Sequence, residues 1–172
     1  MGLSSRRHFL PALALVLVLP GCGFALRGTP RFAFESLRVQ GSEGTPIARE
    51  LQEVLREGGV RVFDSRLPAS PEGETGQVVL TVLTDQRERS VVGQTAAGQV
   101  RELQLRTRFR FRLASAQGVQ LLEETELLLE RDISFTETAA LAKEAEEALQ
   151  YRDMQRDITQ QVMRRLAAVQ RP

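Results

Sequence analysis

Four arginines at alternate positions are the most distinctive arrangement of polar side chains in this sequence. They lie in the segment VRELQLRTRFRFRLAS, where Leu, Thr and Phe fill the positions between them. On a β-strand, side chains two residues apart share a face and are about 6.6–7 Å apart. Guanidinium groups at that spacing can bind successive phosphates or carboxylates. This arginine row consists of Arg106, Arg108, Arg110 and Arg112.

The next segment offers a second explanation for the arginine row. VQLLEETELLLERDI carries an acidic row, also at one parity, formed by Glu124, Glu126, Glu130 and Asp132. Opposite charges that face each other across two antiparallel strands stabilise the sheet modestly. The sequence therefore leaves open whether the arginine row meets a ligand, a partner protein or the neighbouring strand.

Residues for catalysis or for a metal site are scarce. His8 is the only histidine and precedes Cys22, the only cysteine, so a chain cut at Cys22 has no imidazole base or ligand. GQTAAG lacks the lysine of a phosphate-binding glycine loop, and a hydrolase that uses two carboxylates stays a remote alternative. We expect no enzyme activity, no cofactor and no metal. The formal charge of +1 and 5% aromatic residues also argue against nucleic acid as a partner.

The first 21 residues have the order of a secretory signal peptide. A basic SRRH stretch precedes the apolar run FLPALALVLVL, which is too short to span a bilayer. Leu19, Pro20, Gly21 and Cys22 then resemble the lipobox of bacterial lipoproteins, in which the cysteine is acylated and becomes the first residue. The resemblance implies that acyl chains such as palmitate anchor Cys22 in the membrane, and that Gly23 directs the protein to the outer membrane.

The same signal contains a pattern that concerns the export route. Ser5, Arg6, Arg7, Phe9 and Leu10 resemble the twin-arginine export motif. Any secretory signal needs a basic start, so the sequence does not decide between the general and the twin-arginine routes.

After the signal, the pattern of residues predicts one folded domain. Residues 22–34, rich in Gly and Pro, are expected to form a lipidated tether, and residues 35–170 the domain. Alternation predicts strands at 35–41, 60–64, 77–91, 100–115 and 119–133. A helix is expected at 45–59, capped by Thr45, with Pro46 at its first position and two glycines at its end.

The last element is expected to be a long amphipathic helix, from about Leu141 to Val169. Its apolar residues step by three or four and form one continuous apolar stripe: Leu141, Ala145, Ala148, Tyr151, Met154, Ile158, Val162, Leu166 and Val169. Strands joined by short turns pair antiparallel, and one-sided helices cover a sheet face. We therefore expect an α+β two-layer sandwich, with two helices on one face of a small mixed, mostly antiparallel sheet of four to five strands.

Several segments together resemble the LPS-assembly lipoprotein LptE family, over essentially the whole chain after the signal. They are CGFALRG, GTPIARELQEVLREGGVRV, the hairpin GQTAAGQVRELQL and ALAKEAEEALQYRDMQRDITQQVMRRL. The resemblance implies a lipoprotein on the inner leaflet of the outer membrane, facing the periplasm or a barrel lumen. It also implies that the protein plugs and helps to assemble the LptD barrel, and takes part in lipopolysaccharide transport and insertion.

The resemblance also implies residues that bind lipopolysaccharide. Lys143 lies where the family has a functional lysine at the start of the last helix. The family typically has a basic residue directly before the hairpin glycine, where this sequence has Val92; Arg89 is the nearby substitute. Arg106, Arg108 and Arg110 of the arginine row are further candidates. The alternative is a lipoprotein that acts alone and binds an anionic lipid or glycolipid through the arginine row.

Overall fold

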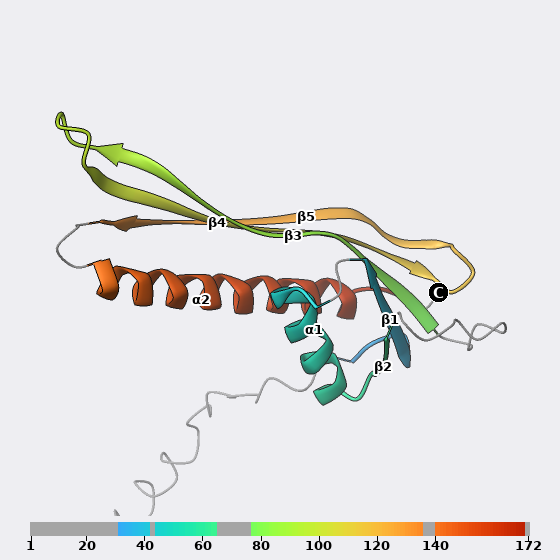
Figure 1. Cartoon of the computed structure of the whole chain (residues 1–172). Coiled ribbons are helices and arrows are strands. Elements are labelled where there is room, and N and C mark those ends of the chain that lie inside the picture. The colour runs from blue at the N-terminus through green and yellow to red at the C-terminus, as the bar shows by residue number, and fades with distance from the viewer. Residues whose placement is uncertain (1–30, 42–43, 65–76, 136–139, 171–172) are drawn as a thin grey trace, which may run out of the picture.

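A computed structural model describes residues 31–41, 44–64, 77–135 and 140–170 (Figure 1). Along the chain the elements are β1 (Ser36–Gly41), α1 (Pro46–Glu57), β2 (Arg61–Asp64), β3 (Gln77–Gln94), β4 (Val100–Ser115), β5 (Gln120–Ser134) and α2 (Ala140–Ala167). The expected order of strands and helices is confirmed. β3 extends three residues beyond its predicted end, because the turn occupies only the residues between Gln94 and Val100.

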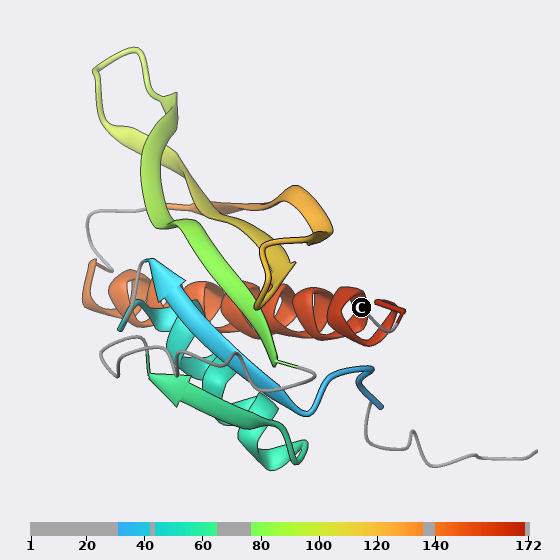
Figure 2. The same ribbon diagram turned by 90° about the vertical axis from the view of Figure 1, so that its right-hand side faces the viewer.

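The strands form one mixed sheet in the order β2-β1-β3-β4-β5. β1 is parallel to both β2 and β3, whereas β3, β4 and β5 form an antiparallel meander. Both helices lie on one face of the sheet (Figures 1 and 2), so the predicted α+β two-layer sandwich is confirmed. β1 pairs with β3 only as far as Val82, and the rest of the β3–β4 hairpin projects beyond it.

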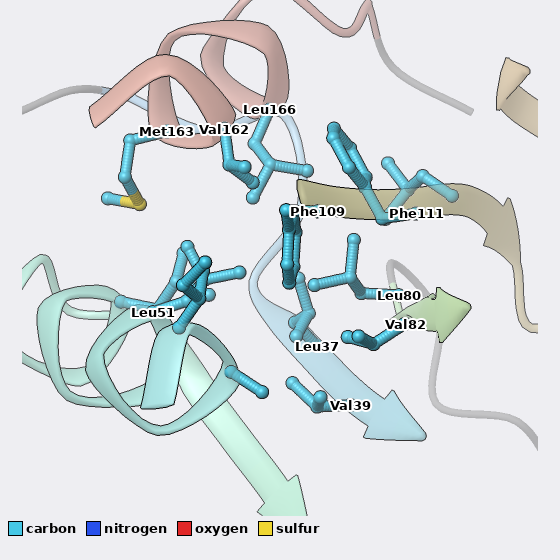
Figure 3. Packing of buried hydrophobic residues seen from close by; sticks show 14 of the residues in the cluster. Leu37, Val39, Leu51, Leu80, Val82, Phe109, Phe111, Val162, Met163 and Leu166 are labelled. Carbon is cyan, nitrogen blue, oxygen red and sulfur yellow. The ribbon is translucent and has the colours of Figure 1, made fainter. Parts of the chain in front are cut away.

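The main core lies between the two helices and the inner face of the sheet (Figure 3). The alternating Leu and Phe side chains of β4 supply its sheet side, and Phe109, Phe111 and Leu113 are fully buried. Leu51 of α1 and Met163 of α2 approach them from the helix side. Phe34, which the sequence places in the tether, is also a core residue, so packing of the domain already includes the end of that segment.

The N-terminus of α1 is capped by a residue from β3. Thr45 occupies the cap position, but its side chain makes no capping hydrogen bond, so the predicted role of Thr45 is wrong. Instead, Asp85 Oδ2 accepts hydrogen bonds from the backbone N–H groups of Ile47 (3.0 Å) and Ala48 (3.4 Å). Pro46 has no N–H, so this carboxylate satisfies the two N–H groups that follow it.

A β-bulge in β3 explains why Asp85 points toward the helices. The β3–β4 register shifts between Val82 and Thr84, which places the extra residue Leu83 in the strand. Before the bulge the even-numbered residues face the core, and after it the odd-numbered residues do, since Asp85 pairs with Phe109. The bulge thus turns Asp85, Arg87 and Arg89 to the helix side of the sheet.

The apolar stripe of α2 is buried only in its second half. Tyr151, Met154, Ile158, Val162 and Leu166 of this stripe are buried. The first three residues of the predicted stripe, by contrast, are exposed: Leu141, Ala145 and Ala148. The apolar stripe is therefore buried only in part, because α1 packs only along the C-terminal part of α2 (Figure 1).

Candidate functional site

The arginine row lies on the face of the sheet that the helices leave open, and it pairs with the acidic row of β5. Arg106 Nε is 2.7 Å from Glu130 Oε1, and Arg108 Nη1 is 3.4 Å from Glu126 Oε1. Arg110 forms an ion pair with Glu124 through Nη2. Of the explanations that the sequence left open, this geometry matches neutralisation by the adjacent strand.

These ion pairs are partly exposed: about a third of the surface of each of the three arginine side chains is accessible to solvent. Exposed pairs of this kind stabilise a protein by only about 0.2–1 kcal/mol each. Within the described residues, Arg112 has no ion-pair partner, because the register shifts of the β4–β5 pairing fall beside it. The arginine row therefore consists of three cations that pair with glutamates and one, Arg112, that has no ion-pair partner in the described part of the chain.

Lys143, the only lysine in the sequence, lies at the start of α2 and reaches back to the sheet. Its Nζ donates hydrogen bonds to Glu146 Oε2 (2.7 Å) and to Ser134 Oγ at the end of β5 (3.3 Å). Only 19% of its side chain is exposed. Lys143 thus fastens the first turn of α2 to β5, and an anionic ligand would have to compete with Glu146 for its ammonium group.

Arg89 approaches the same part of α2 from the other flank. Its Nε is 3.5 Å from Glu147 Oε2, and half of its side chain is exposed. Glu147 lies one helical turn after Lys143, on the same side of α2. The structure therefore brings Arg89 and Lys143 to one region, the first half of α2 and the strands beneath it, whereas the arginine row lies on the opposite face of the sheet.

A further cation at this end of the molecule was not identified from the sequence. Arg101 is exposed and lies in β4 between Val100, which pairs with Gln94, and Glu102, which pairs with Gly93. It forms no ion pair with the residues that the structure describes. In the β3–β4 pairing Arg101 lies opposite the junction of Gly93 and Gln94, next to the position of Val92. Only the β3–β4 register shows that Arg101 is close to Val92, because the two residues are nine positions apart in the sequence.

Tyr151 and Arg87 join the middle of α2 to β3. Tyr151 Oη donates a 2.6 Å hydrogen bond to the backbone carbonyl of Glu88, and the guanidinium of Arg87 lies 5.2 Å from the ring centroid. Burial, with a smaller contribution from the Glu147 carboxylate, raises the pKa of Tyr151 above its ordinary value of 10.0. This cluster holds the hairpin against the helix and offers no nucleophile at neutral pH.

Two negative observations apply to the described part of the chain. No group of three or more His, Cys, Asp or Glu side chains is placed to hold a metal ion. No helix there combines the length and the apolar character needed to cross a membrane. Cys22 and the signal peptide lie outside the described residues, so lipidation of Cys22 stays a prediction.

Two curated relatives cover almost the whole chain. The LPS-assembly lipoprotein LptE of Photorhabdus laumondii is 26% identical over 170 residues, and that of Pectobacterium atrosepticum is 29% identical over 172 residues. In both cases the alignment covers 95% of this chain and 88% of the relative. The similarity therefore includes both helices and the whole sheet.

Solved structures with a similar fold include two bacterial lipoproteins. Lipoprotein B of Nitrosomonas europaea is 30% identical, with a TM-score of 0.69 over 85% of this chain and 91% of that one. Rare lipoprotein B of Shewanella oneidensis is 25% identical, with a TM-score of 0.62 over 77% and 94%. A family model described as "LptE: Lipopolysaccharide-assembly" matches residues 34–166, which is nearly the entire folded domain, and the chain belongs to the LptE family.

Proposed function

We propose that this protein is an outer-membrane lipoprotein that plugs an LptD-type β-barrel, helps to assemble it and takes part in delivering lipopolysaccharide to the cell surface. Acyl chains on Cys22 would anchor it to the inner leaflet, with the domain facing the periplasm or the barrel lumen. The observation that carries the proposal is the match to LPS-assembly lipoproteins along 95% of the chain.

The chemistry of the domain supports a role in assembly. The sheet face opposite the helices carries ion pairs that leave it nearly neutral, as Arg106, Arg108 and Arg110 each have a glutamate within 4 Å. Such a surface can lie against a polar barrel wall and bury little unpaired charge, since Arg112 is the one arginine of the row without an ion-pair partner among the described residues. No step in this role requires a general base, a nucleophile or a bound metal.

The alternative is a lipoprotein that binds an anionic lipid alone, through the arginine row. The ion pairs weigh against it, because a phosphate would have to displace the glutamates that already hold three of the four guanidinium groups. This exchange replaces one anion by another and yields little net binding free energy. The other candidate contacts with lipopolysaccharide are Arg101, which forms no ion pair with the described residues, and the two positions that the family resemblance indicates, Lys143 and Arg89. Lys143 and Arg89 also pair with glutamates, which a phosphate would have to displace.

The barrel partner is tested by affinity capture of the full chain from detergent-solubilised outer membrane, followed by mass spectrometry. We expect an LptD-type barrel in stoichiometric amount, and loss of surface lipopolysaccharide when the chain is depleted. Capture of the intact lipoprotein without any barrel protein would refute the proposal. A Cys22→Ser variant separates anchoring from binding, since it should lose the membrane fraction but still bind the purified barrel.

Contacts with lipopolysaccharide are tested by charge reversal. Lys143→Glu, Arg89→Glu and Arg101→Glu should each reduce binding of purified lipopolysaccharide several-fold, whereas Arg164→Glu, at an exposed position in the last turns of α2, should not. Because Lys143 and Arg89 also make ion pairs, thermal melting of each variant is measured in parallel. If Lys143→Glu, Arg89→Glu and Arg101→Glu all bound lipopolysaccharide as well as Arg164→Glu does, this set of contacts would be excluded.

A further inference from the structure

Beyond its bulge, β3 is joined to the helices by polar side chains rather than by apolar packing. In the described part of the chain, no residue of β3 after Val82 belongs to either cluster of buried apolar side chains. The helix side of β3 carries Asp85, Arg87 and Arg89 there. The end of the β3–β4 hairpin projects away from α2 (Figures 1 and 2), so the position of this part of β3 on the helices depends on individual hydrogen bonds and ion pairs.

The two arginines of β3 match the spacing of residues along α2. Residues two apart on a strand are about 6.6 Å apart, and residues four apart on a helix are about 6 Å apart along its axis. Arg89 pairs with Glu147, and Arg87 contacts both the ring of Tyr151 and the amide of Gln155. β3 and α2 therefore meet in register over two turns of the helix, with Gln155 at one end of the contact.

Gln155 joins three elements through the two ends of its amide. Its Oε1 accepts a 2.6 Å hydrogen bond from Arg87 Nη2. Its Nε2 donates to the backbone carbonyl of Pro46 at 3.2 Å and to Glu50 Oε2, both in α1. A guanidinium only donates, whereas a carbonyl or an ionised carboxylate only accepts, so a primary amide satisfies both sides at once. An ionised glutamate at this position would keep only the contact with Arg87, and a methionine would keep neither.

The contacts of Gln155 with α1 also orient its oxygen toward β3. Because Pro46 and Glu50 hold Nε2, Oε1 points to the guanidinium of Arg87. The other contact of Arg87 is with the ring of Tyr151, at 5.2 Å from its centroid. A cation can slide over a ring face at little cost, whereas a hydrogen bond has a preferred distance and angle. Gln155 is therefore the contact that determines where Arg87 lies along α2.

We propose that Gln155 is a positioning residue for lipopolysaccharide binding and that it acts through Arg89. By fixing Arg87 on α2, it holds Arg89, two residues farther along the same face of β3, beside the turn of α2 that carries Lys143. Gln155 itself does not contact the ligand. The inference rests on the proposed function, in which Arg89 and Lys143 contact lipopolysaccharide, and it names the residue that sets the position of one relative to the other.

The position of the hairpin is measured on the full-length lipoprotein in detergent, in which the proposed acylation leaves Cys22 without a free thiol. Spin labels on cysteines introduced at Gln94 and Ala148 report the distance between β3 and α2 by electron paramagnetic resonance. Gln155→Met should shift or broaden the distance distribution. Gln160→Met is the matched control, at an exposed position of the same helix, and should not change it. A distribution unchanged by Gln155→Met would overturn the inference and leave the proposed function as it stands.

Binding of purified lipopolysaccharide shows whether this position matters. Gln155→Met should weaken binding by about three- to tenfold, whereas Gln160→Met should not. Gln155→Glu should retain most of the binding, because it still accepts from Arg87, although the lost hydrogen bonds to α1 should lower Tm. In an Arg89→Glu background, Gln155→Met should cause little further loss, whereas in a Lys143→Glu background its loss should persist.

Two results would show that Gln155 only stabilises the fold and would overturn the inference. One is an equal loss from Gln155→Met in the Arg89→Glu and Lys143→Glu backgrounds, and the other is a loss that Gln155→Glu reproduces in full. If Arg89→Glu alone left binding unchanged, the contact assigned to Arg89 under the proposed function would be refuted, and this inference with it. The spin-label distances distinguish the two failures, since they are measured without lipopolysaccharide.

Discussion

Asp85 is expected to stabilise the domain by capping α1 from a strand 38 residues away in sequence. Its Oδ2 accepts hydrogen bonds from the backbone N–H groups of Ile47 and Ala48. The side chain of Thr45 caps neither of these two groups. Loss of a capping side chain costs about 0.5–2 kcal/mol, and the charge at a helix N-terminus contributes about 0.3–1 kcal/mol at an exposed site. For Asp85→Ala we expect a loss of about 1.5–2.5 kcal/mol in the free energy of unfolding.

The measurement is thermal and urea unfolding of the soluble domain. For a domain of this size, each kcal/mol lowers Tm by roughly 2–5 °C, so Asp85→Ala should lower Tm by about 3–12 °C. Asp85→Asn keeps one carbonyl acceptor and should lose about half as much. Because the urea dependence of the free energy reflects the surface exposed on unfolding, its slope should stay unchanged.

Thr45→Ala is the matched control, since Thr45 occupies the cap position without a capping side-chain bond. It should cost less than half of the free energy lost in Asp85→Ala. If Thr45→Ala were as destabilising as Asp85→Ala, or if Asp85→Ala left Tm unchanged, the assignment of the cap to β3 would be refuted.

Three further predictions concern single residues. Tyr151, the only tyrosine, should ionise above pH 10.0 in the folded protein, which phenolate absorbance measures. The free energy of unfolding should then fall as the pH rises from the ordinary pKa of tyrosine through the raised pKa of Tyr151. Tyr151→Phe should not show this loss. Gly41→Ala should cost at least about 3 kcal/mol, as Gly41 has φ +100° and its Cβ would meet Val82 O; Gly98→Ala, with φ +80° but open space, should cost about 1 kcal/mol. Thr107→Val should raise the free energy of unfolding by about 1 kcal/mol, because the hydroxyl is buried and unpaired among the described residues; an unchanged or lower Tm would contradict this.

Local patterns in the sequence were sufficient to predict most of the architecture. The alternation in β4 placed Leu103, Leu105, Phe109, Phe111 and Leu113 on one face, and all five are buried. Proline and glycine bounded α1 correctly. The first feature depends on the alternation of side chains between the two faces of a strand, and the second on the backbone conformations that proline and glycine allow. Both are therefore determined by residues that are close in the sequence.

The contacts that depend on a second element could not be predicted in this way. Strict alternation from Val82 would have placed Asp85 on the open face of the sheet, and only the bulge at Leu83 turns it to α1. Likewise, the apolar periodicity of α2 continues through Leu141 and Ala145. Whether that stripe is buried depends on where α1 ends, which the sequence of α2 does not contain.

The distribution of compensated and free cations indicates where this domain can bind anions. Arg106, Arg108 and Arg110 already hold carboxylates, so an incoming anion must displace one and gains only the difference between two similar ion pairs. Arg49, Arg101 and Arg152 have no such partner among the described residues and offer the full charge-assisted hydrogen bond, about 1.5–3 kcal/mol. Regular spacing made the arginine row conspicuous in the sequence, but its cross-strand pairing leaves less of its charge for a ligand than the arginines at the hairpin end and between the helices offer.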